Sequence, residues 1–176
     1  MKFTETKLCG AFIVTPDVIE DERGFFSRAF CRNEFQLRDL EANVAQCNIS
    51  FNRTGGTLRG MHYQAPPHQE VKLVRCTMGA VFDVIIDLRP GSRSYLDWFG
   101  VELSAENRRM LYVPRGFAHG YITLRDNVEV YYQVSEFHAR GSERGVRWND
   151  PAFGIEWPIE PRVVSEKDRN HPPYTA

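Results

Sequence analysis

Five side chains that are capable of acid–base or electrostatic catalysis fall on segments with the pattern of β-strands. They are Arg59 and His62 in TLRGMHYQ, Lys72 in VKLVRCT, His119 in FAHG and Tyr132 in VEVYYQV. Histidine is a competent general base near neutral pH, lysine can stabilise an oxyanion, and tyrosine can donate a proton. Together these groups suit the removal of a proton beside a ketone and its return on the other face, which is the chemistry of an epimerase or isomerase.

Alternation along two of these segments directs the lysine and the tyrosine inward. Lys72 shares a face with Val74 and Cys76, and Tyr132 shares the face of the valines in 128–134. An inward lysine needs a partner or a function. Two plainer interpretations stay open: Lys72 reaches water from the strand end, or Tyr132 is a core residue with a satisfied hydroxyl.

The two histidines follow glycine-containing segments. Gly60 interrupts the strand just before His62, which suggests a bulge or a close backbone approach, and His119 follows a Pro-x-Gly turn. Each histidine alone is more often structural than catalytic, so the hypothesis rests on the whole set.

Several other chemistries lack their motifs. No G-x-S-x-G, G-x-G-x-x-G or P-loop is present, which argues against a serine hydrolase, a dinucleotide fold and an NTPase. The pattern from Pro114 to His119 resembles the second cupin motif, whose metal-binding members also carry H-x-H and a Glu. Here the first stretch reads His62-Tyr63-Gln64, and His68 and Glu70 have the wrong spacing. We therefore expect no metal and no cofactor, with a metal-dependent cupin oxygenase as an alternative.

Composition narrows the class of protein. The 176 residues include 22 Lys and Arg and 23 Asp and Glu, for a net charge of −1. This length favours one domain, and the balance argues against a nucleic-acid binder. We see no signal peptide or membrane span, and the spacing of Cys9, Cys31, Cys47 and Cys76 favours free thiols. We expect a cytoplasmic protein.

The coarse pattern is that of an all-β protein. Alternation at 80–88 puts Phe82, Val84, Ile86 and Leu88 on one apolar face and Asp83 and Asp87 on the other. Further strands are expected at 71–77, 111–113 and 120–124, and one helix at 33–40 with Asn33 as its N-cap. Many short strands favour an antiparallel sandwich, jelly roll or barrel, with the segment from Pro158 wrapped around the outside.

Ordered motifs along nearly the whole chain point to one family. They are DERGFF (21–26), QCNIS (46–50), LRGMHYQ (58–64), KLVRC (72–76), GAVFDVIIDLRPGS (79–92), GVELSAENRRMLYVPRGFAHG (100–120), WNDPAFGIEWP (148–158) and SEKD (165–168). The chain resembles the dTDP-4-dehydrorhamnose 3,5-epimerase family, which has a cupin-type jelly roll. The resemblance implies a single epimerase domain over 1–176, with a jelly-roll core at about 44–150 and a few short helices.

The resemblance also implies a reaction and residue roles. The reaction is metal-free epimerisation at C3 and C5 of a nucleotide-linked 4-keto-6-deoxyhexose, as in dTDP-rhamnose biosynthesis. His62 would be the base, oriented by Asp168, with Tyr132 as the acid and Lys72 beside the enolate oxygen. The expected substrate-binding residues are Arg23, Phe26, Arg28, Gln46, Asn48, Arg59, Lys72, His119, His138, Glu143 and Lys167. Arg23 and Phe26 would reach a neighbouring subunit, so the resemblance implies a homodimer with exchanged N-terminal strands.

Departures from the family pattern gather at the expected nucleotide pocket. Arg28 stands where a Glu is usual, Phe137-His138 replaces a Tyr-Tyr pair, Cys47 replaces an Asp, and Val71 replaces a Gly outside that pocket. An arginine cannot accept the hydrogen bonds of a carboxylate. The alternatives are therefore an epimerase acting at one centre, one using a CDP- or other NDP-linked sugar, or a non-catalytic sugar-binding jelly roll.

Overall fold

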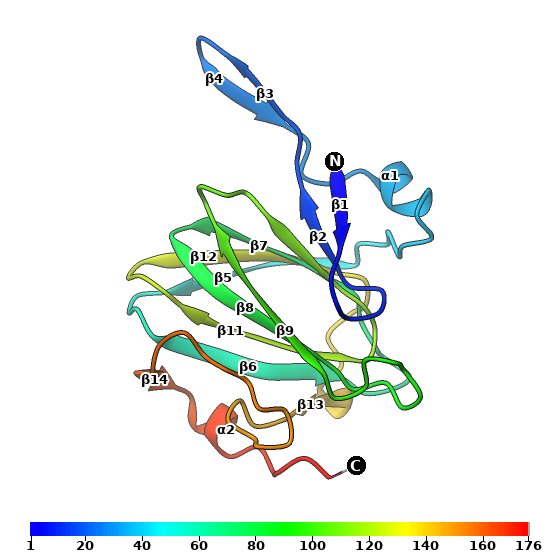
Figure 1. Cartoon of the computed structure of the whole chain (residues 1–176), viewed down its shortest axis with the longest axis vertical. Helices are drawn as coiled ribbons and strands as arrows, with labels where there is room; N and C mark the ends of the chain where they lie inside the picture. The colour runs from blue at the N-terminus through cyan, green and yellow to red at the C-terminus, as the bar shows by residue number, and fades with distance from the viewer. Residues whose placement is uncertain (176) are drawn as a thin grey trace.

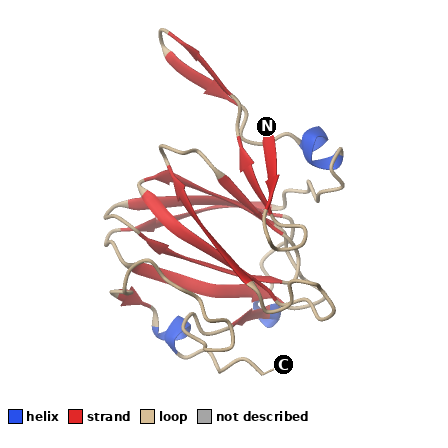
Figure 2. Cartoon of the chain, in the orientation of Figure 1, coloured by secondary structure: helices blue, strands red, loops and turns tan. Residues whose placement is uncertain are grey.

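Two β-sheets face each other and enclose most of the buried side chains (Figures 1 and 2). The computed structural model describes residues 1–175. The first sheet has the order β1 (Lys2–Glu5), β2 (Phe12–Thr15), β10 (Met110–Val113), β7 (Lys72–Met78), β12 (Val128–Val134) and β5 (Gln46–Asn52). The second has the order β13 (Glu143–Gly145), β6 (Thr57–Gln64), β11 (Phe117–Thr123), β8 (Ala80–Asp87) and β9 (Trp98–Ser104), and β14 (Val163–Val164) pairs parallel to β6. The expected all-β jelly roll is confirmed.

One hairpin and three helical segments lie outside this pair of sheets. The hairpin of β3 (Val18–Asp21) and β4 (Gly24–Ser27) extends away from the body (Figure 1). The helical segments are short: α1 (Arg32–Gln36), the 3-10 turn η1 (Arg140–Ser142) and α2 (Glu166–Arg169). Among residues 1–175, no helix is long and apolar enough to cross a membrane. The four cysteines are free thiols.

The inner faces of the sheets form the main core, and the alternation along β7 and β12 predicted which of their faces lie in it. Val74 and Cys76 of β7 are buried against Ile85 of β8 and Val130 of β12. Tyr132 packs against this cluster, as its place among the valines predicts. Since side chains alternate along a strand, this packing turns Lys72 to the same interior as Val74.

Both faces of β8 are buried, which the alternation alone did not indicate. Asp83 and Asp87 have no exposed surface and lie on the opposite face from Phe82, Val84 and Ile86. The face of Val84 and Ile86 packs under the C-terminal segment, which supplies Trp148, Phe153 and Trp157. The charged side of the pattern therefore points into the protein, where each carboxylate needs partners.

The predicted helix at 33–40 has the wrong bounds. Helix α1 begins at Arg32 and ends at Gln36, and its N-cap is Cys31, whose side chain makes no capping hydrogen bond. Asn33 lies inside the first turn. Burial of Phe35 against Phe3 and Tyr112 holds this short helix in place, so tertiary packing outweighs the capping preference.

Asp87 provides a stability test. Its carboxylate accepts hydrogen bonds from Arg89 (2.7 Å), Ser92 (2.5 Å) and Ser94 (2.7 Å). Burial by itself raises the pKa of this carboxyl, but these hydrogen bonds outweigh it and lower the pKa to about 2. A folded-state pKa below the unfolded value contributes stability above about pH 4 that is lost as the pH falls toward about 2.

We predict that Asp87→Asn lowers the free energy of unfolding by about 2 kcal/mol near pH 7 and by much less near pH 2. Urea denaturation of both proteins across this range measures the difference. Glu102→Gln, at an exposed position of β9, is the control and should change little at any pH. A difference in the free energy of unfolding that does not change with pH would contradict the claim that the ionised Asp87 carboxylate stabilises the fold.

Candidate active site

A cavity of about 230 Å³ lies between the two sheets and takes side chains from both of them. Its lining residues are Gln46, Asn48, His62, Tyr63, Gln64, Glu70, Lys72, Tyr132, Val134, His138 and Glu143. The structure therefore brings together three of the four predicted catalytic residues and several of the predicted binding residues.

His62 of β6 is paired with Asp168 of α2, which is the fourth predicted catalytic residue. The distance from His62 Nε2 to Asp168 Oδ1 is 2.7 Å, and the backbone N–H of Gly60 donates to Asp168 Oδ2 at 3.2 Å. Ser165 caps the short helix by accepting from the backbone N–H of Asp168 at 3.1 Å. The cap and the contact with β6 place a buried carboxylate directly behind the histidine.

The ionisation of Asp168 sets the tautomer of His62. Burial raises the pKa of the Asp168 carboxyl, but the hydrogen bond and charge of His62 and the N–H of Gly60 outweigh this and lower it. An ionised carboxylate only accepts hydrogen bonds, so a neutral His62 donates through Nε2–H. Its other nitrogen, Nδ1, then carries the lone pair that can take a proton.

Lys72 is buried and paired, so the interpretation that it reaches water from the strand end is wrong. Its side chain is 11% exposed and donates a hydrogen bond to Glu70, whose side chain is equally buried. Gln64 Nε2 donates to the other oxygen of Glu70 at 3.1 Å. Sequence reasoning considered Glu70 only as a metal ligand, although the spacing Glu-x-Lys at the start of a strand was a usable signal.

Tyr132 faces the same cavity from β12. It lies diagonally across from Lys72 on the neighbouring strand, because Tyr132 pairs with Val74 and Val134 pairs with Lys72. Burial, with smaller contributions from Tyr121 and Glu70, raises the pKa of the Tyr132 phenol. The phenol is therefore a proton donor at neutral pH.

Arg59 and His119 flank the cavity and do not line it. His119 Nε2 lies 3.0 Å from both carboxylate oxygens of Asp83, and burial raises the pKa of that carboxyl against the opposing charges of His119 and Lys72. Arg59 Nε donates to Asn52 Oδ1 at 2.7 Å.

Arg59 lines a neighbouring cavity of about 370 Å³ together with His62, Lys167 and Asp168. His62 therefore lies between two cavities. Lys167 also donates a hydrogen bond to Glu143, which lines the first cavity.

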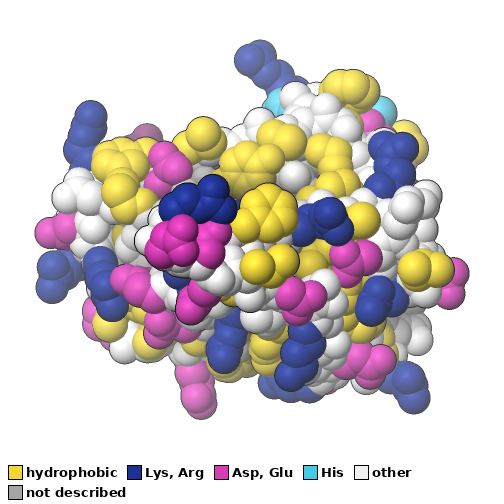
Figure 3. All heavy atoms as spheres, turned by 90° about the horizontal axis from the view of Figure 1, so that it is seen from above, with side chains coloured by type: hydrophobic (Ala, Val, Ile, Leu, Met, Phe, Trp, Pro, Cys, Tyr) yellow, Lys and Arg dark blue, Asp and Glu magenta, His cyan; other side chains and the backbone are white. Residues whose placement is uncertain are grey.

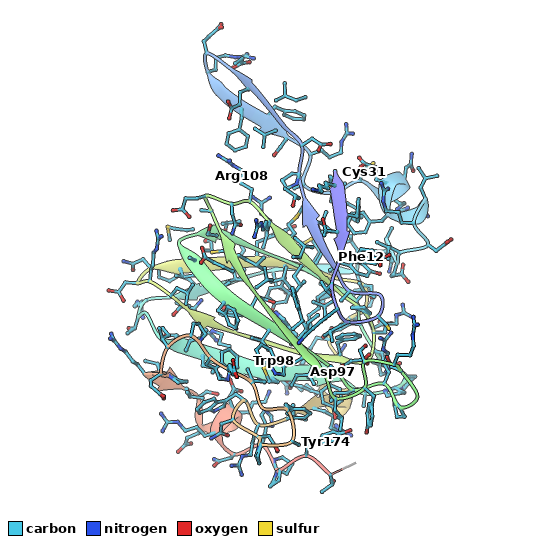
Figure 4. The ribbon with its side chains drawn as sticks, viewed as in Figure 1. Phe12, Cys31, Asp97, Trp98, Arg108 and Tyr174 are labelled. Atoms are coloured by element: carbon cyan, nitrogen blue, oxygen red, sulfur yellow. The ribbon has the colours of Figure 1, made fainter. Side chains whose placement is uncertain are left out.

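Three predicted residues lie away from these cavities. Arg23, Phe26 and Arg28 are exposed on or next to the β3–β4 hairpin, and Arg23 pairs with Asp21. Figure 3, which looks down on this end of the molecule, shows hydrophobic side chains exposed among charged ones. The guanidinium of Arg108, which is labelled in Figure 4 below the hairpin, stacks on Phe25 of β4 at 4.1 Å from the ring centroid. Within one chain, the hairpin does not complete the site.

Sequence reasoning also missed Gln64 and His171. Gln64 Nε2 donates to the backbone oxygens of His68 (3.0 Å) and Phe137 (3.2 Å), and its Oε1 accepts from the N–H of Ala139 (2.7 Å). These hydrogen bonds connect the loop that contains His138 to strand β6, where Gln64 lines the cavity. His171 lies beside Asp168, and in residues 1–175 these two and His62 form a group of side chains that could hold a metal ion.

Comparisons with known proteins identify the family. The sequence profile described as dTDP-4-dehydrorhamnose 3,5-epimerase matches residues 5–176. An enzyme of that name from Methanothermobacter thermautotrophicus is 44% identical over 98% of this chain and 94% of its own.

Solved structures agree with the sequence comparison. The dTDP-4-dehydrorhamnose 3,5-epimerase from Elizabethkingia anophelis superposes with a TM-score of 0.96 at 41% identity, covering 99% of this chain and 96% of that one. The enzyme from Bacillus anthracis, solved with TDP and pyrophosphate bound, gives a TM-score of 0.95 at 38% identity, covering 98% and 99%.

We predict that Gln64→Leu loosens the loop that carries His138. Leu leaves several polar partners unsatisfied, so the free energy of unfolding should fall by about 1–3 kcal/mol. The amide of Ala139 should also exchange its hydrogen faster, as measured by NMR. Gln36→Leu, at an exposed position of α1, is the control. Unchanged exchange at Ala139 would show that Gln64 does not hold the loop.

Proposed function

The chain belongs to the dTDP-4-dehydrorhamnose 3,5-epimerase family, and we propose that it converts dTDP-4-dehydro-6-deoxy-D-glucose to dTDP-4-dehydro-L-rhamnose by inverting C3 and C5. The observation that carries this proposal is the convergence of the His62–Asp168 pair, Lys72 and Tyr132 around the space between the sheets.

His62 is the proposed base. The ketone at C4 acidifies the hydrogens at C3 and C5, because the electrons of a broken C–H bond can pass to the carbonyl oxygen. Nδ1 of His62 takes the proton, and the ring becomes an imidazolium. Asp168, held ionised, stabilises that positive charge and fixes the ring, as a buried carboxylate does behind a catalytic histidine.

Lys72 is the proposed partner of the enolate oxygen. Its ammonium is held by Glu70 at one side of the cavity, so a developing oxyanion meets a cation already in place. Such preorganised charge in a site shielded from water is a large contribution to catalysis.

Tyr132 is the proposed acid. His62 comes from β6 of the second sheet, whereas Tyr132 and Lys72 come from β12 and β7 of the first. A sugar ring lying between the sheets is therefore approached by the base on one face and by the phenol on the other. The phenol returns a proton to the enolate carbon opposite to the one removed, which inverts the centre. His62 and Tyr132 can act first at one carbon and then at the other if the sugar ring changes its orientation in the cavity between the two steps.

We assign the nucleotide diphosphate to the polar residues at the edge of the cavity. Gln46 and Asn48 of β5 and His138 line the cavity, and Gln46 Oε1 accepts from the backbone N–H of His138 at 2.9 Å. Arg59, His119 and Lys167 supply cationic or donor groups for the sugar and phosphates. Because His138, Cys47 and Arg28 depart from the family pattern, another nucleotide base is the second candidate.

We further propose a homodimer in which the β3–β4 hairpin reaches the partner's site. Ile19 and Phe26 of the hairpin are 66% and 65% exposed, and Ile49 of edge strand β5 is 66% exposed. Exposed apolar side chains on an extended hairpin are typical of an interaction surface. In such a dimer Arg23 and Phe26 contact the nucleotide bound by the other subunit. The proposed setting is the cytoplasm, where the free thiols are stable.

Turnover in heavy water tests the function. With dTDP-4-dehydro-6-deoxyglucose, NMR should show deuterium entering at both C3 and C5. Deuterium at one carbon only would favour a single-centre epimerase. The alternative nucleotide is tested by comparing kcat/KM for the same sugar linked to CDP with kcat/KM for the dTDP-linked sugar. Absence of exchange with either nucleotide sugar would contradict the proposal.

Two variants separate the base from the acid in that assay. His62→Ala should lower exchange at both carbons by about 10²–10⁴-fold, because the base is gone, while dTDP binding by calorimetry changes little. Tyr132→Phe should continue to exchange but lose inversion, because His62 returns the proton to the face from which it came. His68→Ala, on an exposed loop, is the control. Equal loss of exchange and inversion in Tyr132→Phe would contradict the assigned acid.

Mixing two inactive variants tests the exchanged hairpin. Light scattering should give twice the 20.4 kDa chain mass. An Arg23→Ala/Phe26→Ala double variant and His62→Ala should each turn over poorly, but re-associated hybrids contain one intact site. An equal mixture should recover about a quarter of wild-type activity. A monomeric protein, or no recovery on mixing, would contradict the proposed exchange.

A further inference from the structure

His171 lies against the His62–Asp168 pair and has no part in the proposed reaction. Its Nε2 is 3.8 Å from Asp168 Oδ1, and its ring centroid is 5.9 Å from that of His62. The side chain is only 12% exposed, and within residues 1–175 its buried Nε2 has no hydrogen-bond partner. A buried polar atom without a partner costs free energy, so its position beside a carboxylate and a second imidazole requires a reason.

Packing against Gly145 and hydrogen bonds of the neighbouring residues hold His171 in this position. Its ring packs directly over Gly145, where an added Cβ would lie 2.2 Å from His171 Nε2, and Gly145 pairs with His62 in the β13–β6 register. Beyond His171, the N–H of Tyr174 donates to Asp150 at 2.7 Å and its hydroxyl lies 2.8 Å from that of Tyr95. Asp168 before the histidine is held by His62, and Tyr174 after it, labelled in Figure 4, is held by Asp150. The C-terminal segment is therefore fixed on both sides of His171.

We propose that His62, Asp168 and His171 form a binding site for a divalent transition metal, with Zn²⁺ as the preferred ion, and that its occupation inhibits the enzyme. Two imidazole nitrogens and a carboxylate oxygen lie within 4.8 Å of one another, and this donor set is typical of zinc.

The geometry needs only a small adjustment. A tetrahedral ion with bonds of about 2.0 Å sets its ligand atoms about 3.3 Å apart. The 2.7 Å and 3.8 Å separations of Asp168 Oδ1 from the two histidine nitrogens lie on either side of that value. Small side-chain rotations would bring both separations to that value, and a water molecule would complete the fourth position.

Occupation of this site disables the base by moving one proton. In the active tautomer Nε2 of His62 carries the hydrogen donated to Asp168, and Nδ1 carries the free lone pair. A metal ion on Nε2 needs the lone pair of that nitrogen, so the proton leaves Nε2. The single proton of the neutral ring is then on Nδ1, the atom that must accept the substrate proton. This consequence for turnover rests on the proposed role of His62, whereas metal binding itself does not.

Zinc titration of the full-length protein tests the site with two readouts. Calorimetry with Zn²⁺ measures binding, and the initial rate of epimerisation measures inhibition, each variant being normalised to its own rate with a chelator present. His171→Phe retains an aromatic ring over Gly145 but removes the ligand nitrogens, and His171→Ala provides a second variant in case the phenyl ring does not fit. His68→Ala is the matched control, because it removes an exposed histidine outside the cluster.

We expect inhibition of the wild type and of His68→Ala at the same Zn²⁺ concentration. Both His171 variants should need at least tenfold more Zn²⁺ and should lose a calorimetric site, since loss of a direct ligand costs no less than the 10–100-fold typical of outer partners. Equal zinc sensitivity and binding in wild type and His171 variants would overturn the site. Zinc binding that depends on His171 but leaves turnover unchanged would uphold the site and overturn the inhibition. The four cysteines are common to all variants, so zinc bound by thiols cannot produce the difference.

Discussion

The 2.7 Å hydrogen bond between His62 and Asp168 is the contact on which the rest of the site depends. It joins a strand in the middle of the chain to a four-residue helix near its end. A helix this short has little stability of its own, so its position comes from the Ser165 cap, the pairing of β14 with β6 and the packing of the segment that follows. The C-terminal segment therefore belongs to the proposed catalytic machinery and also covers the second sheet.

The facing sheets explain why the remaining groups can act together. A jelly roll presents inward side chains from two sheets to one space, so the proposed base on β6 and the proposed acid on β12 lie across that space from each other. Charges in such an interior must be paired. Lys72 is paired with Glu70, and the buried carboxyl group of Asp83 is in contact with His119. The same pairing that keeps these charges tolerable also holds them in fixed positions for a substrate.

Strand alternation was sufficient to predict the residues whose position depends on a single strand. Lys72 and Tyr132 lie on the inner faces that their valine neighbours indicated. The pairing of His62 with Asp168 could not come from alternation, because it joins segments 106 residues apart, and only the family resemblance suggested it.

The other differences between the sequence predictions and the structure also arise from contacts between segments that are distant in the sequence. Asp83 lies on the polar side of an alternating strand, yet it faces the interior because β8 is covered on both faces. Gln64 and His171 carry no local signal, since their importance lies in contacts with loops and with the C-terminal segment. The bounds of α1 follow from the burial of Phe35, which capping preferences do not describe.

A crystal structure with a bound dTDP-4-keto sugar, or with a stable analogue of it, tests the central claim most directly. The account predicts the ring between the sheets, with C3 and C5 facing Nδ1 of His62, the Tyr132 hydroxyl on the opposite face, and the C4 oxygen within hydrogen-bonding distance of Lys72 Nζ. A sugar with His62 and Tyr132 on the same face, or one bound outside the space between the sheets, would contradict it.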